Sequence, residues 1–121
     1  MVPETLRKLF LLHFILDYIA AIPLMFAPVK TMMLLGWDNP ESVATRLVAA
    51  ALMGIGGISL IAYKADADTY RHMLTMKLLW SGSAVLGLVL SLAEGAPVFT
   101  WVFLFIFGVF FIIWLFYRVR I

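Results

Sequence analysis

The chain of 121 residues contains no cysteine. This absence excludes disulfide bonds, thiolate-ligated metal sites and cysteine nucleophiles. Only two histidines are present, and with cysteine missing they are too few for an ordinary structural metal site. We therefore expect no bound metal ion and no cofactor.

Charged residues are also scarce. They make up 13% of the chain, against 64% hydrophobic residues, whereas soluble domains average about 25% and about 45–50%. A soluble domain this small could not bury so much apolar surface. The net charge of +2 is small, and the basic residues gather at segment ends, so it does not indicate a nucleic-acid partner. The composition indicates an integral membrane protein that is surrounded by the lipid bilayer.

Four hydrophobic stretches are long enough to cross a bilayer at about 1.5 Å per residue. The sequence predicts helices over residues 5–26, 42–63, 69–92 and 98–117. Residues 29–38 are too few to span and are interpreted either as a segment in the membrane interface or as a loop packed on the bundle end. Short connections favour antiparallel neighbours. We expect an all-α fold, a four-transmembrane-helix antiparallel bundle that forms one domain over residues 1–121.

Ionisable side chains interrupt the predicted spans at four positions: His13, Asp17, Arg46 and Lys77. His13 and Asp17 lie four residues apart, which places them on one helix face. The two charges and the lack of a clean cleavage site also argue against a cleaved signal peptide. A carboxylate in a membrane costs at least about 2.5 kcal/mol to insert, so Asp17 should face protein or a cavity.

Asp17 has two candidate partners. Helix rise places Lys77 at a depth close to that of His13, whereas Arg46 enters its helix from the opposite membrane side. We prefer Lys77, because opposite charges at similar depth offset each other's insertion cost, and Arg46 stays open as the alternative. The four residues are interpreted either as a polar site for a proton, ion or small headgroup, or as ion pairs that only orient the helices.

Small residues are concentrated in the middle of the predicted helix 42–63. Ala50 and Gly54 have the small-xxx-small spacing that lets helix backbones approach closely in lipid, and Gly57 follows. We interpret them as helix-packing residues rather than as a ligand groove. A homo-oligomer could form through this face or through the uniformly apolar helix 98–117.

Several short motifs resemble those of the small four-helix membrane proteins grouped with the DoxX-like families. They are Phe26-Ala27-Pro28 at the end of the first helix, Leu34 to Trp37, the Arg46-led helix with Ala50 to Gly57, and the turn from Glu94 to Pro97. The resemblance covers most of the chain at the level of hydropathy and turns. It implies a four-helix bundle and, from members that are accessory subunits of quinone-linked systems, a membrane protein partner. It assigns no catalytic residue.

These observations lead to two functional hypotheses. The first is binding or transport of a small or lipid-like molecule or ion through the intramembrane polar site. The alternative is a non-catalytic accessory or assembly subunit of a larger membrane complex. Signals for an enzyme are weak, because no serine or cysteine nucleophile is placed with His13 and Asp17, and an enzyme acting on a lipid or quinone is a third, weaker reading.

Basic residues are distributed unevenly between the two ends of the predicted spans. Four crossings place both termini on one side, and positive charge there exceeds that on the other side, which carries Lys30 and Arg46. On the first side lie Arg7, Lys8, Lys64, Arg71, Arg118 and Arg120. The positive-inside rule then predicts cytoplasmic termini in the inner, cytoplasmic membrane of a cell.

A single cysteine introduced at either terminus should react with a membrane-impermeant thiol reagent only from the cytoplasmic side. The same reagent should label Lys30→Cys from the opposite side, and the natural chain, which has no cysteine, is the blank. Labelling of a terminal cysteine from outside the cell would overturn the topology.

Overall fold

The structure, a computed structural model, describes residues 1–121 and is 79% helical with no strands. Its helices are α1 (Glu4–Phe26), α2 (Pro28–Leu34), α3 (Ser42–Ile61), α4 (Ala67–Ala93) and α5 (Thr100–Arg118). All except α2 are long and apolar enough to cross a membrane. The predicted all-α fold with four membrane-spanning helices is confirmed, and the chain is a multi-pass membrane protein.

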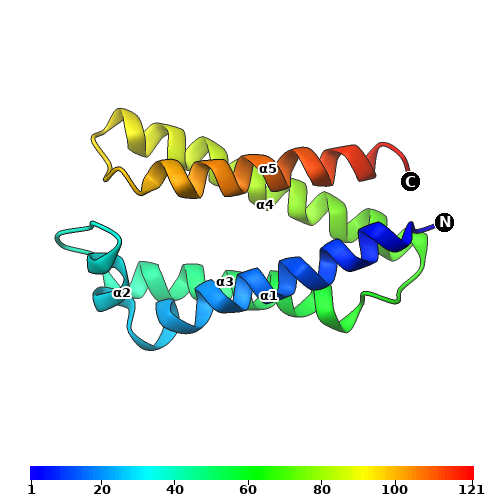
Figure 1. Cartoon of the computed structure of the whole chain (residues 1–121), viewed down its shortest axis with the longest axis horizontal. Helices are drawn as coiled ribbons and strands as arrows, with labels where there is room; N and C mark the ends of the chain where they lie inside the picture. Colours follow the sequence, from blue (N-terminus) through cyan, green and yellow to red (C-terminus); the bar gives the residue numbers. More distant parts are fainter. The chain divides into compact units, whose positions relative to one another are not determined.

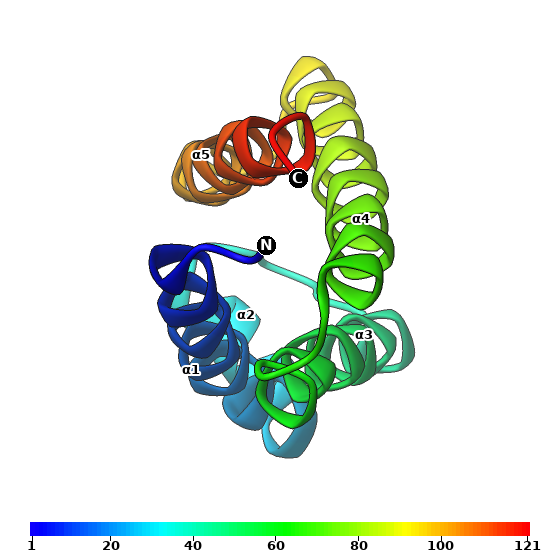
Figure 2. The same cartoon turned by 90° about the vertical axis from the view of Figure 1, so that its right-hand side faces the viewer.

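The helices form two compact units. Residues 3–65 make one unit, and residues 66–121 with residues 1–2 make the other. In the first, α1 and α3 lie side by side and antiparallel, and in the second α4 and α5 form an antiparallel hairpin (Figures 1 and 2). Antiparallel packing of neighbours is therefore seen within each unit, while the assignment of the whole chain to one domain stays a prediction.

Helix boundaries agree with the sequence-based ranges to within two residues. The predicted interfacial segment contains α2, a seven-residue helix that starts at Pro28. Its side chains include Val29, Met33 and Leu34, which are 41%, 54% and 79% exposed. Exposed apolar side chains on so short a helix suit a position in the membrane interface, which stays a prediction.

Acidic residues cap the N-termini of α3 and α4. The Glu41 carboxylate accepts hydrogen bonds from the N–H groups of Val43 (2.9 Å) and Ala44 (2.6 Å), and the Asp66 carboxylate accepts one from Thr69 (2.9 Å). These bonds favour the ionised form, so the pKa of each carboxyl lies below its usual value. The stabilisation is present above the unfolded-state pKa and is lost as pH falls through the lower folded-state pKa.

Glycine ends α4 in a left-handed conformation. Gly95 has φ 86°, its N–H donates to Leu92 O (3.2 Å), and the N–H of Ala96 donates to Ser91 O (3.0 Å). This pair of hydrogen bonds is a Schellman motif, which satisfies carbonyls at the helix end and requires the positive φ. Gly36, with φ 109°, ends α2 in the same way.

Replacing Gly95 with alanine should destabilise the α4–α5 turn by about 1–2 kcal/mol, because a Cβ is unfavourable in the left-handed region. Thermal unfolding in detergent, followed by circular dichroism, would show a lower midpoint. Gly87→Ala is the matched control, since Gly87 lies within α4 and a Cβ there meets nothing within 4 Å. An equal or higher midpoint for Gly95→Ala than for Gly87→Ala would contradict this account of the turn.

Candidate functional site

His13 and Asp17 lie on the buried face of α1. The buried residues of this helix recur at intervals of three or four positions, which is one face of an α-helix: Leu6, Phe10, His13, Asp17 and Ala21. His13 and Asp17 are 5% and 7% exposed, and the His13 Nε2 atom lies 3.3 Å from Asp17 Oδ1. The two ionisable groups that share a helix face in the sequence are thus in contact.

Gly56 of α3 packs directly against Asp17 on the facing helix. A Cβ at Gly56 would lie 2.8 Å from Asp17 Cβ and 3.0 Å from Asp17 Oδ2. Real Cβ atoms do not pack at 2.8 Å, so the Asp17 side chain occupies the space that a side chain at Gly56 would need. The absence of a side chain at Gly56 is what lets α3 approach the Asp17 carboxylate.

A second α1–α3 contact follows one residue along each helix. The Tyr18 hydroxyl donates a hydrogen bond to Met53 O (3.0 Å), and a Cβ at Gly57 would lie 3.2 Å from that hydroxyl. The Tyr18 ring also packs on Phe14, with ring centroids 4.8 Å apart. Gly57, which the sequence assigned to helix packing, therefore lies beside a hydrogen-bonded tyrosine.

The small-xxx-small pair on α3 lies elsewhere on the helix. Ala50 and Gly54 are exposed, and a Cβ at Gly54 would meet nothing within 4 Å. The buried row is made by Ala49, Leu52, Gly56 and Ser59. Because each residue turns the helix by about 100°, a step of one position separates the two rows. Close packing at Ala50 and Gly54 does not occur with α1 and stays a prediction for another helix.

Arg46 is placed at the end of α1, not at Asp17. Its Nε donates to the carbonyl oxygen of Met25 (2.9 Å), and its side chain is exposed. Met25 is eight positions beyond Asp17, which is about 12 Å along a helix. A guanidinium there satisfies a terminal carbonyl and complements the negative end of the helix dipole. The structure therefore does not bring together Asp17 and Arg46, our alternative pair.

Lys77 is fully buried in the α4–α5 unit. Its Nζ lies 5.0 Å from the centre of the Trp114 ring, which is itself 1% exposed. One turn later, the Ser81 hydroxyl donates to Lys77 O (2.7 Å). An ammonium over an indole face gains a cation–π attraction that is larger where water is excluded. The pairing of Lys77 with Asp17 stays a prediction.

Trp114, Gly56 and Tyr18 are the site neighbours that sequence reasoning missed. Trp114 lies on the helix that follows Lys77, at a similar distance from the turn that joins α4 and α5. The similar distance of Lys77 and Trp114 from this turn was the feature of the sequence from which a cation–π pair could have been predicted. No comparable signal distinguished Gly56 from the other small residues of α3.

Chemically, the His13–Asp17 contact can hold a proton or a polar group within an apolar helix. An imidazole accepts a proton at one ring nitrogen and a carboxylate stabilises the resulting cation. The described chain contains no group of three histidine, aspartate or glutamate side chains that could hold a metal ion.

Comparisons with protein-family models, curated proteins and solved structures found no match to this chain. The resemblance to DoxX-like proteins accordingly stays an expectation from the short motifs.

Gly56→Ala should weaken the α1–α3 packing by about 1–3 kcal/mol, because the added methyl group overpacks against Asp17. Gly54→Ala is the matched control: it makes the same change on the same helix where nothing lies within 4 Å. Both variants gain helix propensity equally, so the difference between their unfolding midpoints measures the clash. Equal midpoints would contradict the close approach of α3 to Asp17.

Proposed function

We propose that this protein binds or transports a small or lipid-like molecule or an ion through an intramembrane polar site. His13 and Asp17 form the centre of that site, with Lys77 and Arg46 as further candidates. The observation that supports the proposal best is the contact between two buried ionisable side chains in the middle of α1. Ionisable residues in membrane spans are costly, and a substrate or proton pathway is their commonest use.

The packing around Asp17 adds support. Because Gly56 has no side chain, the α3 backbone lies against the Asp17 carboxylate. Two apolar side chains of similar volume could take the place of His13 and Asp17 in this interface. Replacing buried ion pairs with apolar residues is often neutral or stabilising. A pair retained at this cost is therefore better explained by a ligand or proton than by packing alone.

The second candidate function is that of an accessory or assembly subunit of a larger membrane complex, in which the charges orient helices. Two contacts favour it: Arg46 caps α1, and Lys77 lies against Trp114. The α5 surface also exposes large apolar side chains, including Trp101, Phe105 and Ile112. Such a surface fits lipid, a second copy of the chain or a membrane protein partner.

The arrangement in the cell follows the charge distribution. We propose that the protein lies in the cytoplasmic membrane with both termini in the cytoplasm, where the positive-inside rule places them. A homo-oligomer through the exposed Ala50–Gly54 face of α3 or through α5 belongs to the same proposal.

The deciding experiment is native mass spectrometry of the gently extracted protein, followed by identification of any small molecule released on denaturation. A stoichiometric molecule that Asp17→Asn reduces by about tenfold or more would support the binding function, because charge-assisted hydrogen bonds contribute about 1.5–3 kcal/mol. Asp38→Asn, at an exposed position outside the helices, is the matched control. Circular dichroism would establish that both variants are folded.

Two other outcomes would move the assignment to the accessory subunit. One is a bare oligomer, or one that carries another protein, in place of a small ligand. The other is a loss of folded protein in Asp17→Asn without any separable binding defect.

A further inference from the structure

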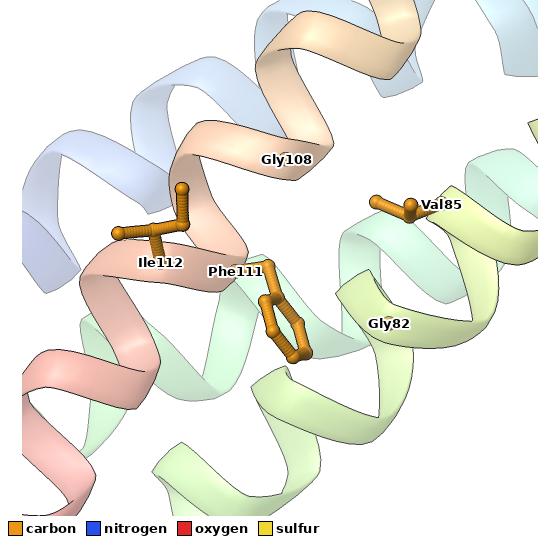
Figure 3. A pocket seen from close by; sticks show the side chains of 5 residues that line it. All are labelled: Gly82, Val85, Gly108, Phe111 and Ile112. Atoms are coloured by element: carbon orange, nitrogen blue, oxygen red, sulfur yellow. The ribbon is translucent and has the colours of Figure 1, made fainter.

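The α4–α5 hairpin carries an apolar groove. It has a volume of about 320 Å³ and is lined by Gly82 and Val85 of α4 and by Gly108, Phe111 and Ile112 of α5 (Figure 3). None of these side chains is polar. A Cβ at Gly108 would meet nothing within 4 Å, so this glycine leaves the groove open. The groove can therefore receive a narrow apolar chain.

A basic side chain lies at the end of the same hairpin. Arg118 donates from Nε to Thr75 Oγ1 (3.1 Å), and the Thr75 hydroxyl donates in turn to Arg71 O (2.9 Å). The Arg71 guanidinium is paired with Asp68, whereas no carboxylate contacts Arg118. The terminal nitrogens of Arg118 keep four N–H donors in the planar fork that suits a phosphate.

The groove and Arg118 are aligned along the helices. Thr75 lies seven residues before Gly82 on α4, and Arg118 lies seven residues after Phe111 on α5. Seven residues are two turns, so each pair shares a helix face at a separation of about 10 Å. One leaflet of the hydrocarbon core is about 15 Å thick. A lipid with its phosphate at Arg118 can therefore lay an acyl chain in the groove.

We propose that the α4–α5 hairpin binds one anionic phospholipid, with the headgroup phosphate on Arg118 and an acyl chain in the groove lined by Gly108 and Phe111. The unneutralised guanidinium selects the anionic headgroup, and the apolar groove selects the chain. This site uses none of the polar-site residues His13, Asp17, Arg46 and Lys77, and it does not depend on the proposed function.

The first test addresses the headgroup. The full chain, delipidated in detergent, is mixed with phosphatidylglycerol or with phosphatidylcholine of the same acyl chains, and bound lipid is counted by native mass spectrometry. We expect one phosphatidylglycerol in preference to phosphatidylcholine. Arg118→Gln should reduce its retention about fivefold, the factor expected for one basic side chain at an anionic surface.

Arg120→Gln is the matched control for charge. Arg120 donates to Phe116 O and stacks on the Phe116 ring at 3.6 Å, and two positions turn it about 200° around the helix from Arg118. The Arg120→Gln substitution removes the same charge from the same end of the hairpin as Arg118→Gln does. Retention should therefore fall clearly less than in Arg118→Gln.

The second test addresses the groove. Gly108→Leu adds a side chain to the groove at a position where a Cβ meets nothing within 4 Å, and it should reduce phosphatidylglycerol retention severalfold while Arg118 is intact. Gly87→Leu makes the same change at an exposed α4 position with nothing within 4 Å, and it should leave retention unchanged. If Gly108→Leu is not folded by circular dichroism, Val85→Phe fills the groove from α4.

Three results would overturn the proposal. Equal retention of the two lipids would remove the headgroup preference, and equal losses in Arg118→Gln and Arg120→Gln would show only diffuse attraction. Unchanged lipid retention on filling the groove, with a change of oligomeric state instead, would show that a second copy of the chain occupies it.

Discussion

A carboxylate in the middle of an apolar helix is costly in lipid and must face protein or a cavity, and the packing of the α1–α3 unit meets this constraint. Asp17 contacts His13 along α1 and meets the bare backbone of Gly56 across the helix interface. The next residue, Tyr18, anchors α1 to α3 through Met53 O. The contact between Gly56 and Asp17 thus both brings the two helices together and encloses the carboxylate. This explains why position 56 of α3 is a glycine.

The α4–α5 unit meets the same constraint with different chemistry. Lys77 lies against the face of Trp114, a buried aromatic ring. A cation over an aromatic ring gains an electrostatic attraction that is larger where water is excluded, and this contact favours the buried ammonium. Toward its open end, Thr75 links Arg118 to the carbonyl of Arg71. Lys77 is therefore held against a ring, and Arg118 is held by hydrogen bonds that end at a backbone carbonyl.

This division of roles separates the four charged positions that a sequence alone groups together. Arg46 donates a hydrogen bond to the Met25 carbonyl near the C-terminus of α1, away from Asp17. His13 and Asp17 contact each other within one helix, and neither caps a helix end. The functional proposal consequently depends mainly on the intramembrane His13–Asp17 pair of α1. The basic end of α4–α5 suits contact with anionic lipid.

The sequence by itself determined the membrane class, the four spans to within two residues, and the His13–Asp17 contact, because hydropathy and an i, i+4 spacing are local properties. Only the tertiary structure decided that Gly56 meets Asp17, that Arg46 caps α1 and that Trp114 covers Lys77. Small residues lie all around α3, so composition does not reveal which row faces α1. Contacts between helices depend on the rotation of each helix about its axis, and a rotation of about 100° exchanges one row of side chains for the next.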